Sequence, residues 1–107
     1  MTTFDKREDG FEAGYALEEA IRFKALARRN KLLGLWAAEK LGLAEDEAQA
    51  YAKEVVVADL AEEGDEDVFR KLRGDFDAKG VVVSDHQIRR NMDEFLAQAV
   101  LALRAGE

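Results

Sequence analysis

The sequence predicts an all-α protein, a four-helix bundle-like domain with a partly disordered N-terminal segment. Proline is absent while Ala, Leu, Glu, Lys and Arg are abundant, and this composition favours long uninterrupted helices. Gly42, Gly64 and Gly80 each follow an amphipathic pattern and suit the left-handed conformation that ends many helices. These glycines divide the chain of 107 residues into four segments, and its length fits one modest hydrophobic core.

The first predicted helix begins within residues 3–18 and ends near Leu41. Its main apolar stripe, which we expect to face the core, consists of residues at helical spacing: Phe23, Leu26, Asn30, Leu33, Ala37 and Leu41. Leu35 projects on another side, and Leu32 and Trp36 flank the stripe. A helix that is apolar on more than one side is either central to a bundle or offers a surface to a partner.

The second and third predicted helices cover roughly residues 46–62 and residues 65–79, and Asp65 is expected to be the N-cap of the third. The second helix has a wide apolar face: Ala48, Tyr51, Ala52, Val55, Val56 and Leu60. The third has apolar residues at helical spacing: Val68, Phe69, Leu72 and Phe76. The valine run 55–57 could also form a strand, but its helical flanks and its length favour a helix.

The fourth predicted helix begins after Ser84. Ser84 and Gln87 have the spacing of a capping box, in which each side chain satisfies a backbone N–H of the other residue. The apolar face of this helix comprises Ile88, Met92, Phe95, Leu96, Ala99 and Leu103. The preceding connector, Val81–Val83, is expected to pack over the end of the bundle.

Residues 1–17 differ from the rest of the chain because Gly10 and Gly14 weaken any helix there. Such a helix would present one aromatic stripe: Phe4, Phe11 and Tyr15. A segment with a good amphipathic pattern and low intrinsic stability can fold against a partner. The alternative is an ordinary frayed terminus, and the pattern alone leaves both interpretations open.

Charge and composition exclude several classes of function. The chain has 16 basic and 23 acidic residues and a formal net charge of −7, which opposes binding to the phosphates of nucleic acid. Cysteine is absent, so disulfides and thiolate metal sites are excluded. No apolar stretch approaches the roughly 20 residues that span a bilayer, and the N-terminus has no secretory pattern. We therefore expect a cytoplasmic protein that does not insert into the membrane.

The residues usual in catalysis are nearly absent. There is one histidine and no glycine-rich phosphate loop, and His86, beside Asp85 in the first turn of the last helix, is typical of a surface residue. The acidic stretch 59–67 does not match the calcium-loop pattern and is typical of a solvated connection. We expect no enzyme activity, no catalytic residue, no metal and no cofactor.

The basic residues of the first helix have two interpretations. A candidate anion or nucleotide contact comprises Lys24, Arg28, Arg29, Lys31 and Trp36. This contact would make the protein a small helical domain that senses purine nucleotide or phosphate through weak ATP or ADP binding. The alternative is a solvated basic face, which the lack of a phosphate loop favours.

Four stretches of the chain are similar to one known family. FKALARRNKLLGLWAAEKLGL, residues 23–43, resembles the signature of the zeta-subunit family, the small inhibitor proteins of the alphaproteobacterial F-type ATP synthase. AYAKEVVVADLAEEGDEDVFRKLRGDF, residues 50–76, resembles the same family. Residues 4–25 and 84–99 are similar to its N-terminal segment and last helix, so the resemblance extends over nearly the whole chain.

The resemblance implies a non-enzymatic inhibitory subunit with a flexible inhibitory segment, residues 1–17, and a four-helix domain, residues 18–107. The segment would become helical in a catalytic interface of the synthase head, between the alpha and beta subunits and near the gamma subunit, and block ATP hydrolysis. Positions that match the family's N-terminal pattern are the implied partner contacts: Phe4, Arg7, Glu8, Phe11, Glu12 and Tyr15. Gly14 departs from the family, where lysine is common at this position. The free protein is expected to be a monomer, and the bound protein to lie at the cytoplasmic face of the inner membrane.

Overall fold

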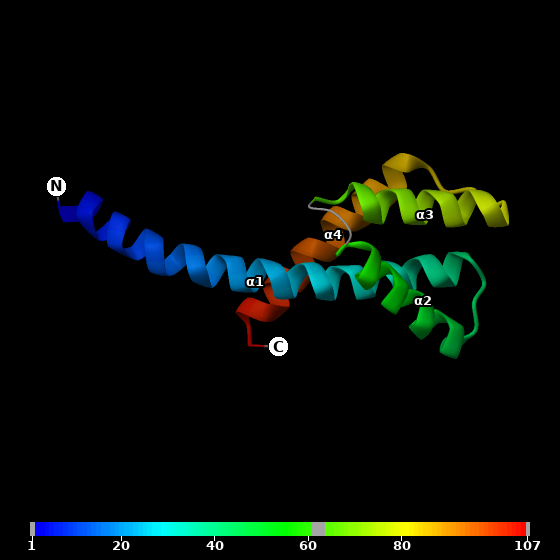
Figure 1. Ribbon diagram of the computed structural model, residues 1–107, viewed down its shortest axis with the longest axis horizontal. Coiled ribbons are helices and arrows are strands. Elements are labelled where there is room, and N and C mark those ends of the chain that lie inside the picture. Colours follow the sequence, from blue (N-terminus) through cyan, green and yellow to red (C-terminus); the bar gives the residue numbers. More distant parts are fainter. Residues whose placement is uncertain (1, 61–63, 107) are drawn as a thin grey trace.

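Four α-helices make up the part of the chain that the structure describes. The computed structural model describes residues 2–60 and 64–106, with side chains from residue 19 onward. In chain order the helices are α1 (Thr2–Lys40), α2 (Glu45–Ala58), α3 (Glu66–Lys79) and α4 (Asp85–Arg104) (Figure 1). The predicted all-α class with four helices is confirmed, and the valine run lies within helix α2. The partial disorder expected for residues 1–17 stays a prediction.

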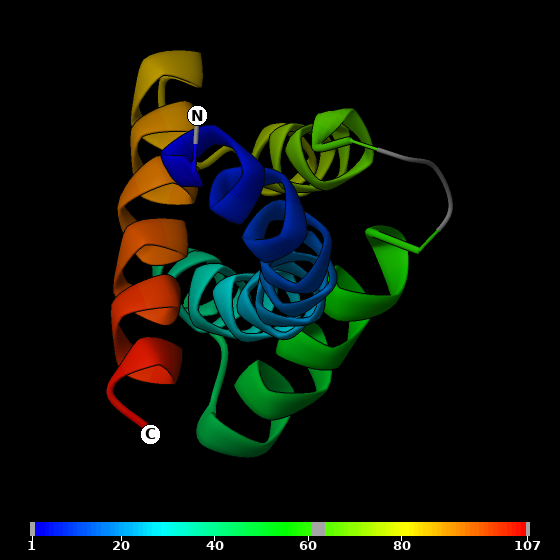
Figure 2. The same cartoon turned by 90° about the vertical axis from the view of Figure 1, so that its left-hand side faces the viewer.

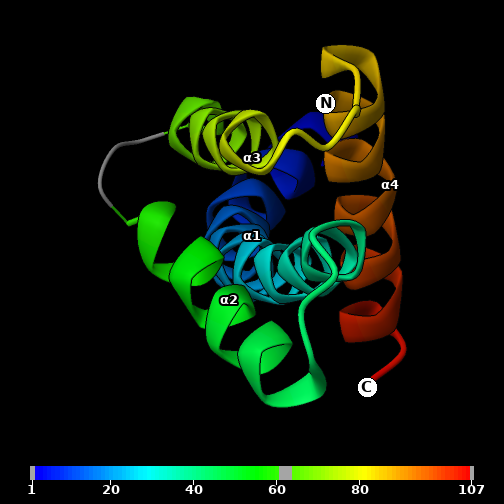
Figure 3. The same cartoon turned by 90° about the vertical axis from the view of Figure 1, so that its right-hand side faces the viewer.

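Helix α1 is the central element of the fold. Its N-terminal half projects beyond the other helices, so the molecule is 59 Å long but only 25 and 22 Å across (Figure 1). Its C-terminal half lies among α2, α3 and α4, as the two end-on views show (Figures 2 and 3), and packs chiefly on α2 and α4. This central position accounts for a helix that is apolar on several sides, because Leu32, Leu35 and Trp36 are all partly buried.

The hydrophobic core draws on all four helices. Trp36 of α1 meets Phe76 of α3 edge to face, with ring centroids 5.8 Å apart and an interplanar angle of 84°. Val83 of the connector before α4 is buried and joins the core as expected, whereas Val82 points to solvent. The core cluster consists of Leu33, Ala37, Ala38, Leu41, Tyr51, Val55, Val68, Leu72, Phe76, Val83, Ile88 and Met92.

Glycines end two of the helices where the sequence predicts. Gly42 after α1 and Gly80 after α3 have φ of 74° and 70°, in the left-handed region that favours glycine. In both turns the N–H beyond the glycine bonds back to a carbonyl of the last turn, at 3.0 Å from Leu43 to Ala38 and at 2.8 Å from Val81 to Phe76. These bonds satisfy carbonyls that a helix end would otherwise leave unpaired.

The two predicted N-caps behave differently. Ser84 and Gln87 form the predicted capping box, with the Gln87 N–H donating to Ser84 Oγ at 3.0 Å and the Ser84 N–H donating to Gln87 Oε1 at 3.1 Å. Asp65 occupies the N-cap position of α3, but its side chain makes no capping hydrogen bond. The predicted N-cap position of Asp65 is therefore confirmed, but its carboxylate accepts a hydrogen bond from Arg29 and does not cap the helix.

A close approach between α1 and α2 depends on Gly34. A Cβ at this position would lie 2.6 Å from the Cα of Ala52 and 3.2 Å from a methyl carbon of Val55. Two helix backbones can come this close only where one of them has no side chain. The sequence does not predict this contact, because a glycine within a helical pattern does not show which helix packs against it.

Two residues predicted to be buried are exposed. Phe23 of α1 and Leu60 after α2 have exposed fractions of 70% and 72%. The physical reason is that α2 ends at Ala58, earlier than the predicted end near residue 62, and the chain turns there, with the Leu60 N–H donating to the carbonyl of Val57 at 3.0 Å. Phe23 and Leu60 therefore lie beyond the end of the packed helix pair.

Candidate functional site

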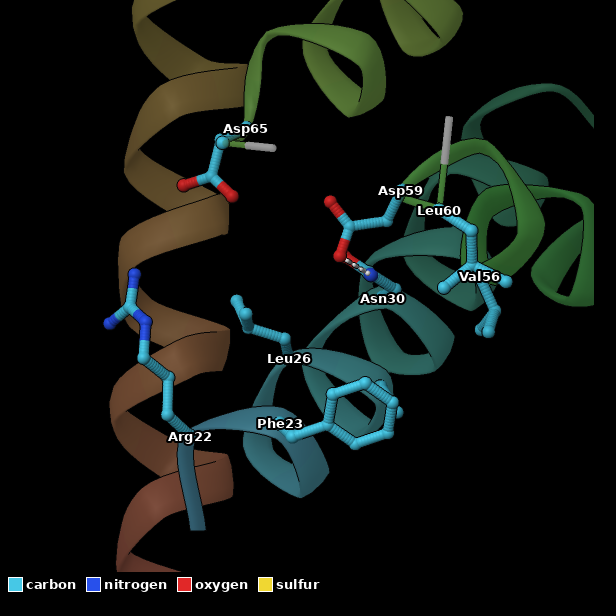
Figure 4. Close-up of a pocket in the computed structure, with 10 residues that line it drawn as sticks. Arg22, Phe23, Leu26, Asn30, Val56, Asp59, Leu60 and Asp65 are labelled. Carbon is cyan, nitrogen blue, oxygen red and sulfur yellow. Dashed lines mark hydrogen bonds between the residues drawn. The ribbon is translucent and has the colours of Figure 1, made fainter. Parts of the chain in front are cut away.

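The early end of α2 leaves an open groove between α1 and the chain that follows α2. The groove has a volume of about 670 Å³ (Figure 4). Phe23 and Leu26 line it from α1, Val56 and Leu60 from α2 and the turn beyond it, and Asp65 from the start of α3. Most of its lining is apolar, and its polar lining residues are Arg22, Asn30, Asp59 and Asp65.

Three of the polar lining residues, Asn30, Asp59 and Asp65, belong to a hydrogen-bonded cluster around the buried Arg29. The Arg29 side chain is 1% exposed, and its Nε donates to Asn30 Oδ1 at 2.8 Å while its Nη2 donates to Asp65 Oδ1 at 2.9 Å. Asn30 Nδ2 donates to Asp59 Oδ2 at 2.9 Å (Figure 4). Because Asp59 follows α2 and Asp65 precedes α3, this cluster fastens both ends of the connection between those helices to α1.

The Arg29 cluster compensates its own buried charge. Arg29 Nη2 also lies 4.0 Å from an oxygen of Asp59, so two carboxylates face one guanidinium. A buried charge is tolerated when it is paired and its donors are satisfied, as here. The cluster therefore serves to fix the geometry of the groove rather than to attract a further ion.

The structure separates the residues of the candidate anion contact. Arg29 is committed to the buried cluster, and Trp36 packs against Phe76 in the core. Lys24 and Lys31 are exposed on another side of α1, and Arg28 is partly buried there. The five side chains therefore do not converge on one surface, although nucleotide binding itself stays a prediction.

The six implied partner contacts have no described side chains. Phe4, Arg7, Glu8, Phe11, Glu12 and Tyr15 lie within residues 2–18, for which the structure describes only the helical backbone of α1. Their assignment to a partner surface stays a prediction. The same helix also lines the groove, because α1 runs without a break from Thr2 to Lys40.

Titratable side chains in the described region have structural roles. Burial raises the pKa of Tyr51 well above its ordinary value of 10.0. The hydrogen bond that its hydroxyl donates to Asp75, 2.6 Å long, raises this pKa further. Hydrogen bonds to Asp85 and Asp77 raise the pKa of Arg73, which joins α3 to the start of α4. Both residues connect helices and neither faces the groove.

Within the described ranges, no three His, Asp or Glu side chains gather as a metal site requires. None of the described helices is long and apolar enough to cross a membrane. A projecting helix and a largely apolar groove on a small helical body are typical of a protein that binds a partner.

Comparison with known proteins identifies the family to which this chain belongs. Residues 1–102 match the family described as ATPase inhibitor subunit zeta, so the chain belongs to this family of non-enzymatic regulators. A solved structure titled "Solution NMR structure of the protein" is 48% identical, with a TM-score of 0.71, over 81% of this chain and 99% of the other. No curated protein matches the chain.

The groove could not be predicted from the sequence. Leu60 continues the helical spacing of α2, so periodicity placed it in the core, and only the turn after Ala58 exposes it. Arg29 lies beside Arg28 and near Lys31 in the sequence, so the sequence predicts it as part of the candidate anion contact. A usable signal was the adjacent Asn30, a polar residue on the apolar stripe that needs buried partners.

Proposed function

We propose that this chain inhibits ATP hydrolysis by the F-type ATP synthase by inserting residues 1–17, as a helix, into a catalytic interface between the alpha and beta subunits, near gamma. Membership of the ATPase inhibitor subunit zeta family supports the inhibitory role. The observation that carries the proposal is the projection of α1, whose N-terminal half extends beyond the four-helix body (Figure 1). The protein would then act at the cytoplasmic face of the inner membrane.

The proposed division of labour assigns insertion to residues 1–17 and anchoring to residues 18–107. Among the described side chains, which begin at residue 19, the first buried one in α1 is Ala25. Residues 19–24 therefore contribute no buried side chain to the core. Phe4, Phe11 and Tyr15 would bury apolar surface in the subunit cleft, while the charged contacts, Arg7, Glu8 and Glu12, would pair with groups lining it.

The test is steady-state ATP hydrolysis by the isolated catalytic head, titrated with the full chain and with a chain lacking residues 1–17. The full chain should inhibit and the shortened chain should not. Phe11→Ala should raise the half-inhibitory concentration by about 30-fold, since a buried aromatic anchor contributes about 2 kcal/mol. Lys6→Ala is the matched control, because helical register puts position 6 on the side opposite the aromatic stripe.

Equal inhibition by the full and the shortened chain would contradict the insertion mechanism and leave the inhibitory role to the four-helix body. Inhibition that Lys6→Ala weakens as much as Phe11→Ala does would contradict the assigned face.

A further inference from the structure

We propose that the groove bounded by Phe23, Leu26, Val56 and Leu60 is a second docking surface, which receives an apolar side chain of the synthase head. The inference rests on the proposed function above and adds a contact made by the four-helix body. It goes beyond insertion of residues 1–17, because two walls of the groove come from α2 and the turn that follows it.

The groove continues the face that carries the proposed insertion residues. Positions 4, 15 and 26 are spaced by 11 residues, which is close to three turns of helix, so all three lie on one side of α1. Positions 11 and 22 have the same spacing, so Arg22, which also lines the groove, shares this side. A partner surface in contact with positions 4 to 15 therefore extends by register toward Leu26 in the groove.

The chemistry of the groove favours an apolar occupant. Phe23 bounds it on the α1 side, and Val56 with Leu60 on the α2 side (Figure 4). Phe23 and Leu60 are two of the large hydrophobic residues that the structure leaves exposed, and they lie in the same groove. Covering such a surface removes apolar area from water, which is the main source of affinity at interfaces.

Apart from Arg22, an exposed residue of α1 that also lines the groove, the polar groups of the groove are paired within the protein. Arg29 and Asn30 donate to Asp65 and Asp59, and Asn30 accepts from Arg29, so these groups are paired within the protein. Because the cluster holds both ends of the connection between α2 and α3, the walls of the groove are fixed before binding. Docking on a preformed surface avoids part of the ordering cost.

The test uses full-length chains in the hydrolysis assay described above. Leu60→Ala is the decisive variant because residue 60 lies outside α1 and cannot enter with the inserted helix. Leu60→Ala and Phe23→Ala should each raise the half-inhibitory concentration about tenfold. Leu60→Met keeps the apolar volume and should inhibit like the unchanged chain. Leu101→Ala, which truncates a residue on α4 of similar exposure, should also have no effect.

The outcomes separate this inference from the proposed function. If the unchanged chain inhibits, Phe11→Ala weakens inhibition and Leu60→Ala does not, the docking surface is refuted and the insertion mechanism stands. If the unchanged chain does not inhibit, both fail. A concentration-dependent mass in sedimentation that Leu60→Ala abolishes, with inhibition unaffected, would assign the groove to a second copy and overturn the inference. Unfolding midpoints of the variants within about 2 °C of the unchanged chain exclude a folding defect.

Discussion

Replacing Gly34 by alanine adds one methyl group at the closest contact between α1 and α2. The new Cβ would lie 2.6 Å from the Cα of Ala52, 3.1 Å from its Cβ and 3.2 Å from Val55 Cγ2. Carbon atoms in contact are about 3.5 to 4.0 Å apart, so the two helices would have to separate by roughly 1 Å. The nearest obstacle is backbone, which cannot rotate away as a side-chain end can.

The expected loss of stability follows from two opposing effects. Forcing a methyl group into a well-packed contact costs about 1 to 3 kcal/mol. Alanine in place of glycine within a helix returns about 1 kcal/mol. Because the nearest obstacle is backbone, we take the upper part of the packing cost, about 2 to 3 kcal/mol. We therefore expect Gly34→Ala to lower the free energy of unfolding by about 1 to 2 kcal/mol, which corresponds to a midpoint about 4 to 10 °C lower for a chain of this size.

Gly74 of α3 provides the matched control. It is also a helical glycine, but a Cβ built there meets nothing within 4 Å. Gly74→Ala should therefore show the helix-propensity gain alone, about 0.5 to 1 kcal/mol of added stability. The same substitution in two helices is thus expected to change stability in opposite directions.

Urea unfolding followed by far-ultraviolet circular dichroism measures both changes, and thermal melting gives an independent midpoint. Gly34→Ala with a stability equal to or above that of the unchanged chain would refute the close approach of α1 and α2. A destabilising Gly74→Ala would show that the contrast arises from the substitution itself and not from the packing of Gly34.

Three further predictions address a helix start, the inhibitory segment and pH. Ser84→Ala removes the capping box of α4 and should cost about 1 kcal/mol in urea unfolding; no change would mean that water caps the helix equally well. Gly14→Ala lowers the cost of helix formation by about 0.5 to 1 kcal/mol, so it should reduce the half-inhibitory concentration about two- to fivefold, and unchanged inhibition would argue against a helical bound segment. In a Tyr15→Phe variant only Tyr51 absorbs as a phenolate, and it should ionise well above pH 10.0 because burial and Asp75 raise its pKa. Since the raised pKa belongs to the folded state, the contribution of Tyr51 to stability should be constant below about pH 10 and be lost above it, and titration of Tyr51 near pH 10 in the folded protein would contradict its burial.

Local signals in the sequence were sufficient for most of the fold. The capping box at Ser84 and the glycines at positions 42 and 80 act through their own backbone, so the sequence predicts them without knowledge of the tertiary structure. The apolar spacing of α3 and α4 also predicts Val68, Leu72 and Ile88 as core residues, and all three are fully buried. These features depend on near neighbours in the chain.

The sequence did not predict features that depend on distant segments. Asp65 takes the predicted N-cap position of α3, but the sequence did not predict that its carboxylate accepts a hydrogen bond from Arg29, far away in the chain. Phe23 and Leu60 fit the periodicity of buried residues, and their exposure depends on where α2 stops relative to α1. The groove exists only because of how distant segments of the chain are arranged, so the periodicity of the sequence alone could not predict it.

Helix α1 forms both the projecting part and the centre of the four-helix body. The distance of the projecting part from the body is therefore coupled to its rotation about the helix axis. Each residue inserted into α1 between them would move the projecting part outward by about 1.5 Å and turn it by about 100°. One inserted residue would therefore point positions 4 and 15 away from the groove, whereas seven would nearly restore their direction about 10 Å farther out. Under the proposed insertion mechanism, chain length between these positions and the body would thus be a determinant of function in itself, independent of which residues occupy the intervening turns.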